Sequence, residues 1–174
     1  SRIVPDVGEV SIEDLIEDEE IIVSVSSNGY VKSVPSTSYK KQGRGGKGVK
    51  AASSDEDVIE HLLSTSVHSY LLFFTDQGKV YRAKAHEIPK TNRTARGSLI
   101  QNVLSMSQDE KVQAIIDTRD YETEKFLLIM TEKGTVKKSK FKDFDSNYKS
   151  LQAIKLKDDD KVVSVKTTSG KEDV

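Results

Sequence analysis

The residue types with the clearest chemical potential lie in one short basic segment rich in glycine. It consists of Gln42, Gly43, Arg44, Gly45, Gly46, Lys47 and Gly48. Glycine lets a backbone approach a ligand closely, and cations beside exposed backbone N–H groups form a concave site for an anion. Three more cations flank the segment with no acid between them: Lys40, Lys41 and Lys50. We therefore predict a phosphate-binding loop, and DNA is the polymer of phosphates that it would serve.

Two nucleotide-binding motifs share part of this pattern, but the neighbouring residues do not meet the requirements of either motif. Gly43, Gly45 and Gly48 have the spacing of the dinucleotide fingerprint, which requires a buried strand before it and a helix after it. Residues 36–42 are polar, and residues 49–57 do not have the pattern of an amphipathic helix. A Walker loop requires Ser or Thr after its lysine, and here glycine follows Lys47.

The remaining residue types indicate neither a metal site nor catalysis. His61, His68 and His86 lack metal-ligand spacing, and the chain contains no cysteine. No nucleophile and base stand in a recognisable arrangement. The apolar runs are of strand length and too short to cross a membrane. We expect a non-catalytic chain with no metal, no cofactor and no membrane partner.

An internal repeat surrounds the basic loop. Each unit has an apolar strand, a polar turn ending in glycine, and a second strand that carries Lys or Arg. These patterns occupy residues 21–39, 70–88 and 126–144. The turn glycines are Gly29, Gly78 and Gly134, and Asn28-Gly29 is a strong hairpin signal. A period of about 50 residues predicts a propeller-like array.

Further anchors support the repeat. A small residue follows each turn glycine by 19 positions, as Gly48, Gly97 and Ala153. Acidic segments that lead into an apolar run recur at residues 55–63, 109–117 and 159–167. We expect the carboxylates of 55–57 and 158–160 to be solvated in turns.

These patterns predict an all-β fold of four-stranded blades, with about three blades and the start of a fourth near residue 172. The expected units are 21–69, 70–124 and 125–174, preceded by an acidic lead-in over 1–20 in which residues 11–14 could open a helix. Expected strands span 21–26, 29–34, 58–65, 69–75, 79–84, 112–118, 125–131, 135–139 and 161–167. Residues 84–88 and 140–144 each suit a single helical turn. Because the chain begins without Met and ends within a unit, we expect a fragment of a longer protein.

The charge distribution points to a polyanion. The net charge is only −1, but the first half of each unit is basic and the segments between units are acidic. If the units stand side by side, the basic halves form a continuous positive rim. Beyond the loop, the cations that we select for DNA phosphates are Lys32, Arg82, Lys84, Arg93, Arg96, Lys137, Lys138 and Lys140.

With repeat and loop together, the chain resembles the C-terminal domain of the DNA gyrase A protein. The family's box, Q-R-R-G-G-K-G, matches residues 42–48 at every position except Gly43, where the family has Arg. The absent Arg removes one phosphate contact, for which Lys40 or Lys41 could compensate. The resemblance continues through 28–35, 71–89 and 131–139 and covers residues 10–174.

The resemblance implies a β-pinwheel, in which neighbouring blades exchange strands. It implies that double-stranded DNA wraps around the rim, so that ATP-driven strand passage introduces negative supercoils. Cleavage, ATP and Mg²⁺ would belong to other domains of the type II topoisomerase. The expected partners are the rest of the gyrase A chain and gyrase B, in an A2B2 heterotetramer in the bacterial cytoplasm.

Other functions remain open on the sequence. The matching domain of the A-type chain of topoisomerase IV has similar blades, but its box is typically degraded or missing. A propeller that binds proteins would bind its partner without sensitivity to salt or to changes in the box. An independent enzyme is the weakest alternative, because no catalytic constellation stands out.

Overall fold

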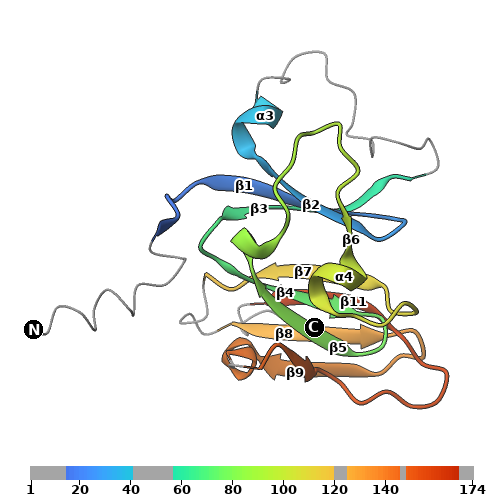
Figure 1. Ribbon diagram of the computed structural model, residues 1–174. Helices are drawn as coiled ribbons and strands as arrows, with labels where there is room; N and C mark the ends of the chain where they lie inside the picture. The colour runs from blue at the N-terminus through green and yellow to red at the C-terminus, as the bar shows by residue number, and fades with distance from the viewer. Residues whose placement is uncertain (1–14, 41–56, 120–124, 146–147, 169–174) are drawn as a thin grey trace, which may run out of the picture.

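The structure is a computed structural model that describes residues 15–40, 57–119, 125–145 and 148–168. Three antiparallel sheets lie side by side (Figure 1). The first has the order β3 (Ile59–Ser66), β1 (Glu20–Ser26), β2 (Tyr30–Pro35) and β6 (Ser98–Leu99). The second has the order β10 (Ser150–Gln152), β5 (Lys79–Lys84), β4 (Tyr70–Thr75) and β7 (Val112–Asp117). The third contains β11 (Val162–Thr168), β8 (Phe126–Thr131) and β9 (Val136–Lys140).

The predicted all-β architecture is confirmed, and every expected strand is present within one or two residues of its predicted bounds. The two predicted helical turns are 3-10 turns, η1 (Ala85–Glu87) and η2 (Phe141–Phe144). The helices α3 (Ser36–Lys40) and α4 (Ile100–Leu104) and the strands β6 and β10 were not predicted. The helix expected at 11–14 and the start of a fourth blade lie outside the described residues.

Neighbouring sheets exchange strands. β6 follows β5 along the chain, but it pairs with β2 of the first sheet, with Val31 opposite Ser98. β10 likewise follows β9 but pairs with β5 of the second sheet, with Val80 opposite Leu151. The outer strand of a sheet is therefore supplied by the next unit of the repeat, as the pinwheel resemblance implies.

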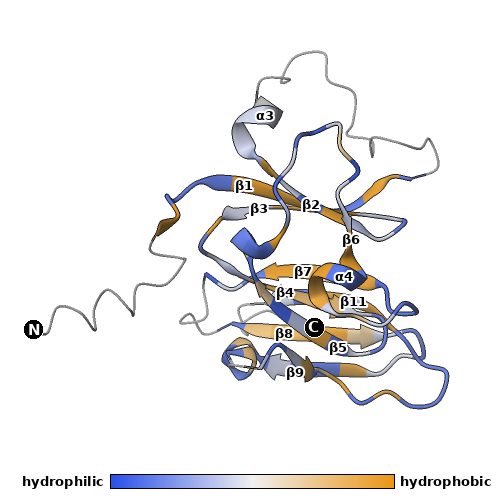
Figure 2. Cartoon of the chain, viewed as in Figure 1, coloured by the Kyte–Doolittle hydropathy of each residue, from blue (hydrophilic) through white to orange (hydrophobic). Residues whose placement is uncertain are grey.

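Two hydrophobic cores fill the spaces between the sheets, and β4 contributes to both. Leu71 and Phe73 pack in the first core with residues of β1 and β2, whereas Leu72 and Phe74 pack in the second core with Leu127 of β8. A strand covered on both faces is apolar at successive positions, which agrees with the orange colour of the central strands in Figure 2. β8 alternates between buried and half-buried positions.

The pairing of the exchanged strands shows that one predicted equivalence between repeat units is wrong. Because Val31 pairs with Ser98 and Val80 with Leu151, the third-unit counterpart of Gly97 is Ser150 and not Ala153. A Cβ at Gly97 would lie 2.5 Å from the Val31 carbonyl oxygen, so glycine permits the close approach of this segment to β2. The residue 19 positions after the turn glycine is therefore not the structural equivalent of Gly97 in the third unit. The segment that connects the hairpin to the exchanged strand is shorter in that unit.

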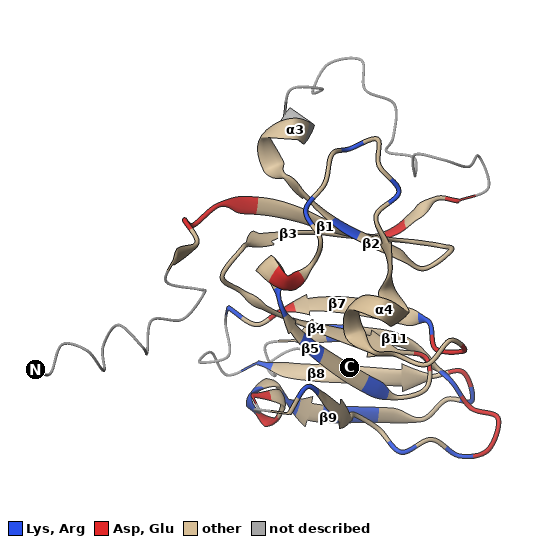
Figure 3. Cartoon of the chain, in the orientation of Figure 1, with Lys and Arg blue, Asp and Glu red and all other residues tan. Residues whose placement is uncertain are grey.

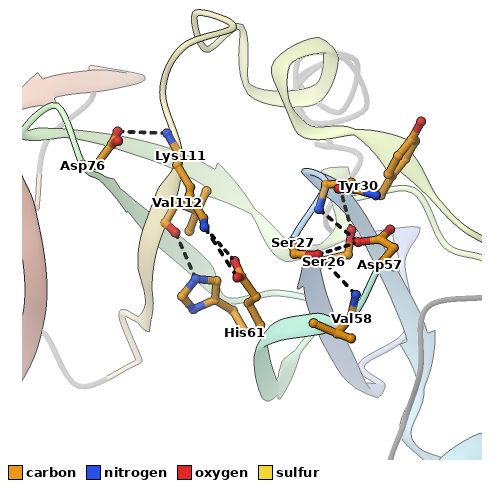
Figure 4. A network of polar contacts seen from close by, with 11 residues as sticks. Ser26, Ser27, Tyr30, Asp57, Val58, His61, Asp76, Lys111 and Val112 are labelled. Carbon is orange, nitrogen blue, oxygen red and sulfur yellow. Dashed lines mark hydrogen bonds and ion pairs between the residues drawn. The ribbon is translucent and has the colours of Figure 1, made fainter. Parts of the chain in front are cut away.

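A buried carboxylate occupies the same place beside the hairpin of each sheet, and in the first and third sheets it accepts a turn amide. Asp57 accepts hydrogen bonds from the Asn28 amide and from Ser27 Oγ, both at 3.0 Å (Figure 4). Asp160 accepts the equivalent amide hydrogen bond from Lys133 at 3.0 Å. Glu110 occupies the corresponding place in the second sheet, and all three carboxylates are buried. The prediction of solvated carboxylates at 55–57 and 158–160 is therefore wrong for Asp57 and Asp160, because unpaired turn amides need acceptors.

Glu110 is longer and reaches further into its sheet. It accepts hydrogen bonds from Thr75 Oγ1 at 2.7 Å, from the Tyr81 hydroxyl at 2.5 Å and from the Ser107 amide at 3.2 Å. Burial acts to raise the pKa of the Glu110 carboxyl, but these hydrogen bonds and the charge of Lys79 together hold the pKa below its usual range. Burial and the nearby carboxylate raise the pKa of the Tyr81 hydroxyl.

The lowered pKa of Glu110 predicts acid sensitivity. A depressed carboxyl pKa contributes stability that is complete above the unfolded value of about 4.3 and is lost as the pH falls through the folded pKa. Glu110→Gln is expected to lower the free energy of unfolding at pH 7 by about 1–3 kcal/mol. It should also flatten the loss of stability below about pH 4. Thermal unfolding from neutral to acidic pH measures both effects.

Glu132→Gln is the matched control, because the Glu132 side chain is exposed. It should leave stability at neutral pH nearly unchanged and retain the acid dependence. A Glu110→Gln protein as stable as the wild type at neutral pH, with the same acid dependence, would contradict the role of this carboxylate.

Candidate nucleic-acid interface

Two of the predicted cations rest on aromatic rings at equivalent positions of successive sheets. The Arg82 guanidinium carbon lies 3.6 Å from the centroid of the Tyr70 ring, and Lys138 Nζ lies 4.5 Å from that of Phe126. Each cation is four residues after its turn glycine, and each ring is the first residue of the neighbouring strand. Cation–π attraction holds a charge in place without neutralising it. The hairpins β4–β5 of the second sheet and β8–β9 of the third sheet thus carry positioned cations, and we call them the outer hairpins.

Other predicted cations extend these two positions along the same strands. Lys84 of β5 also lies over Tyr70, at 5.0 Å, and Lys140 of β9 is exposed. Lys137 donates a hydrogen bond from Nζ to the Ala153 carbonyl at 3.0 Å, so it joins β9 to the segment after β10. Figure 3 shows the resulting blue segments on β5 and β9.

The segment 91–97 carries Arg93 and Arg96 toward β2 of the first sheet. It precedes β6. It is the second-unit counterpart of the loop 42–48, because it follows Gly78 at the same distance at which that loop follows Gly29. Asn92 Oδ1 accepts hydrogen bonds from the amides of Thr94 and Ala95 at 3.0 Å and 2.9 Å. The Arg96 guanidinium lies 4.8 Å from the centroid of the Tyr30 ring, and its Nη1 donates to the Tyr30 hydroxyl at 3.3 Å.

Lys32 fastens this segment to the first sheet. Its Nζ donates hydrogen bonds to the carbonyls of Arg93 at 2.8 Å and Ala95 at 2.7 Å. Burial and the nearby charge of Arg93 lower the pKa of the Lys32 amine. Only 3% of Lys32 is exposed. The prediction that Lys32 contacts DNA is therefore wrong, because its amine is enclosed by backbone carbonyls and a phosphate cannot reach it.

Most of the basic loop itself lies outside the described residues. This applies to Lys41, Lys50 and all of 42–48, so their predicted role stays a prediction. Lys40 ends α3, which follows β2 directly, and its side chain is outside the described part of the structure.

One cation in an equivalent position was not selected from the sequence. Ser150 is the counterpart of Gly97, so Lys149 is the counterpart of Arg96 and, by repeat spacing, of Lys47 in the loop. The carbonyl of Lys149 accepts a hydrogen bond from the Arg82 amide at 2.8 Å. The sequence spacing aligned Ala153 with Gly97, so Lys149 was not identified as the counterpart of Arg96. The pairing of β10 with β5 establishes this equivalence.

The described cations are arranged in a way that suits an extended anion. They lie on the hairpins of the second and third sheets and on the segments that cross to the first and second sheets. Within the described residues, no three His, Cys, Asp or Glu side chains form a group that could hold a metal ion. Among those residues, no helix is long and apolar enough to cross a membrane.

Comparison with known proteins agrees with this architecture. The family model "DNA gyrase C-terminal domain, beta-propeller" matches the chain three times, at residues 20–69, 69–119 and 125–169. The chain is 43% identical over 176 residues to the DNA gyrase A protein of Mycolicibacterium smegmatis and 39% identical over 169 residues to that of Clostridium acetobutylicum. These alignments cover 100% and 96% of the chain but only 21% and 20% of the relatives, so the chain spans about a fifth of their length.

Solved structures show the same fold. The C-terminal domain of a DNA topoisomerase IV aligns with a TM-score of 0.76 and 31% identity, over 89% of this chain and 47% of that one. A DNA gyrase A C-terminal domain aligns with a TM-score of 0.65 and 29% identity, over 86% of this chain and 48% of that one.

The role of Lys32 predicts a specific loss of stability. Lys32→Met preserves length but leaves two carbonyl acceptors without their donor, and it should lower the free energy of unfolding by about 1–3 kcal/mol. Urea unfolding followed by circular dichroism measures the change.

Lys166→Met is the matched control, because Lys166 is also a strand lysine, on β11, and its side chain is exposed. It should cost less than about 0.5 kcal/mol, as is usual for surface substitutions. Equal stability of the Lys32→Met protein and the wild type would show that the amine does not hold segment 91–97.

Proposed function

The chain belongs to the family of DNA gyrase C-terminal β-propeller domains, and on that premise we propose that it binds duplex DNA without sequence specificity and wraps it. The observation that supports this most strongly is the recurrence of positioned cations on successive outer hairpins, as in Arg82 over Tyr70 and Lys138 over Phe126. A duplex that follows these two hairpins would meet a cation of the second sheet and then one of the third.

The physics of wrapping suits such a distributed interface. Smooth bending of 20–30 base pairs costs on the order of 1–6 kcal/mol, which many contacts to the phosphate backbone must offset. Backbone contacts carry no sequence information. Segment 91–97 supports a similar role for the box at 42–48, since this counterpart with two arginines is held by hydrogen bonds to the neighbouring sheet. Arg44 and Lys47 would then grip the duplex at the first unit.

The function of the whole protein extends this proposal. We place the chain in the gyrase A protein of a bacterial DNA gyrase, a cytoplasmic type II topoisomerase assembled with gyrase B as an A2B2 heterotetramer. The wrapped duplex would be presented for ATP-driven strand passage with one handedness, which introduces negative supercoils. Cleavage, ATP and Mg²⁺ belong to other domains in this proposal, and this chain supplies the DNA path.

Topoisomerase IV provides a second candidate function. Its solved C-terminal domain aligns with this chain at a higher TM-score than the solved gyrase domain does. In that case the same cations would select DNA substrates without wrapping them. The nearly intact box at 42–48 favours gyrase.

Duplex affinity as a function of salt tests the proposal. The logarithm of the binding constant should fall with the logarithm of salt concentration by about 0.9 per phosphate neutralised. Arg96→Gln combined with Lys138→Gln should reduce this slope by about 2 and weaken binding. Arg44→Ala combined with Lys47→Ala should also reduce the slope and weaken binding. For this variant, affinity should stop increasing at a shorter duplex length than for the wild type. Fluorescence anisotropy with duplexes of increasing length measures these quantities.

Lys157→Gln combined with Lys161→Gln is the matched control, because both lysines are exposed and lie in the acidic segment between β10 and β11. It should leave the slope nearly unchanged. A wild-type protein whose duplex binding is absent or insensitive to salt would exclude DNA wrapping and favour a protein-binding propeller.

A further inference from the structure

A cationic hollow lies where the third unit crosses onto the second sheet. It comprises two adjoining cavities of about 180 Å³ and 190 Å³ that share Arg82, Glu87 and Lys149. Lys84, Tyr70 and Tyr148 complete the wall of one cavity. Pockets for small-molecule ligands usually have volumes of about 300–1,000 Å³. Each cavity is therefore more suitable for a single phosphate group than for a nucleotide or a cofactor.

The hollow is positive in spite of two nearby acids. Arg82, Lys84 and Lys149 each bring one cation to it. The Glu87 carboxylate accepts a hydrogen bond from the Lys84 amide at 2.8 Å, so it serves the backbone at the start of η1. Asp145 lies 3.9 Å from Arg82 Nη2, and its side chain is 60% exposed. The Arg82 side chain is only 15% exposed, but its acidic partner is distant and well exposed, so an incoming anion can displace the Asp145 carboxylate from Arg82 at little cost.

The exchange of strands assembles this hollow. Arg82 and Lys84 belong to β5, whereas Tyr148 and Lys149 come from the third unit on the segment that leads into β10. Lys149 stands at the place that Arg96 takes against β2, so the same crossing position carries a cation at two successive sheets. Tyr148 is 71% exposed, and its hydroxyl is of a type that commonly donates to DNA phosphates.

We propose that Lys149, with Arg82 and Lys84, forms a phosphate clamp that holds one backbone phosphate of duplex DNA at the junction of the second and third units. This inference rests on the proposed function, and it adds a contact that depends on strand exchange. One crossing segment would then both complete a sheet and grip the duplex. The clamp fixes the path of the DNA from one sheet to the next.

Substitution of Lys149 tests the clamp. Lys149→Gln should reduce the salt slope of duplex binding by about 1 and weaken binding several-fold at moderate salt. Lys149→Arg should restore both, because it keeps the charge. Lys166→Gln removes one exposed charge from β11 and serves as the control. Identical effects of Lys149→Gln and Lys166→Gln would overturn the clamp, provided that circular dichroism shows both proteins folded.

The two proposals fail in different ways. If the wild-type chain does not bind duplex DNA in a salt-dependent manner, the proposed function itself fails. If it binds but Lys149→Gln behaves like the control, only the clamp fails. Backbone amide chemical shifts of Lys149 and Ser150 identify the anion. They should move on addition of duplex DNA and not with inorganic phosphate at equal ionic strength. Shifts with inorganic phosphate alone would reassign the hollow to a small free anion.

Discussion

The structure depends on one constraint, the pairing of one edge of the first and second sheets with a strand from the next unit. β6 closes β2, and β10 closes β5, by only two or three residues each. An exposed edge of a sheet is a template for unwanted pairing, so these short strands protect the edges of β2 and β5. The constraint also fixes the units in series, because no sheet with four strands is complete within its own unit.

The same pairing explains why binding groups occur in crossing segments. A chain that must pass from one sheet to the outer edge of the preceding one runs over the surface where a duplex could lie. Arg96 and Lys149 lie just before the point of pairing. The Arg96 guanidinium contacts Tyr30, and the Lys149 carbonyl accepts a hydrogen bond from the Arg82 amide, so both residues are held in place. Lys32 stabilises this arrangement, because its amine donates hydrogen bonds to two carbonyls of segment 91–97. A positively charged surface can therefore coexist with a net charge near zero, since buried acids such as Asp57 and Asp160 bind turn amides and other acids lie between the units.

The sequence predicted those features that depend on local pattern. Turn glycines such as Gly78 indicated the hairpins, and the apolar run 71–74 indicated a strand, although its burial on both faces became evident only in the structure. β6 and β10 are too short to produce a pattern, and their partners lie in another unit, so their pairing could not be read locally. Lys32 and Lys138 are both lysines in basic stretches. They differ because one meets carbonyls 61 and 63 positions away, whereas the other lies over a nearby ring. Only the tertiary structure separates a buried positioning lysine from an exposed one.

Wrapping is the central claim, and DNA topology tests it most directly. Nicked circular DNA is sealed by ligase with saturating amounts of this chain, the protein is removed, and the topoisomers are separated by electrophoresis. The account predicts a shift in linking number that grows with the amount of bound protein and disappears at high salt. An unchanged topoisomer distribution at saturation would contradict wrapping by this chain.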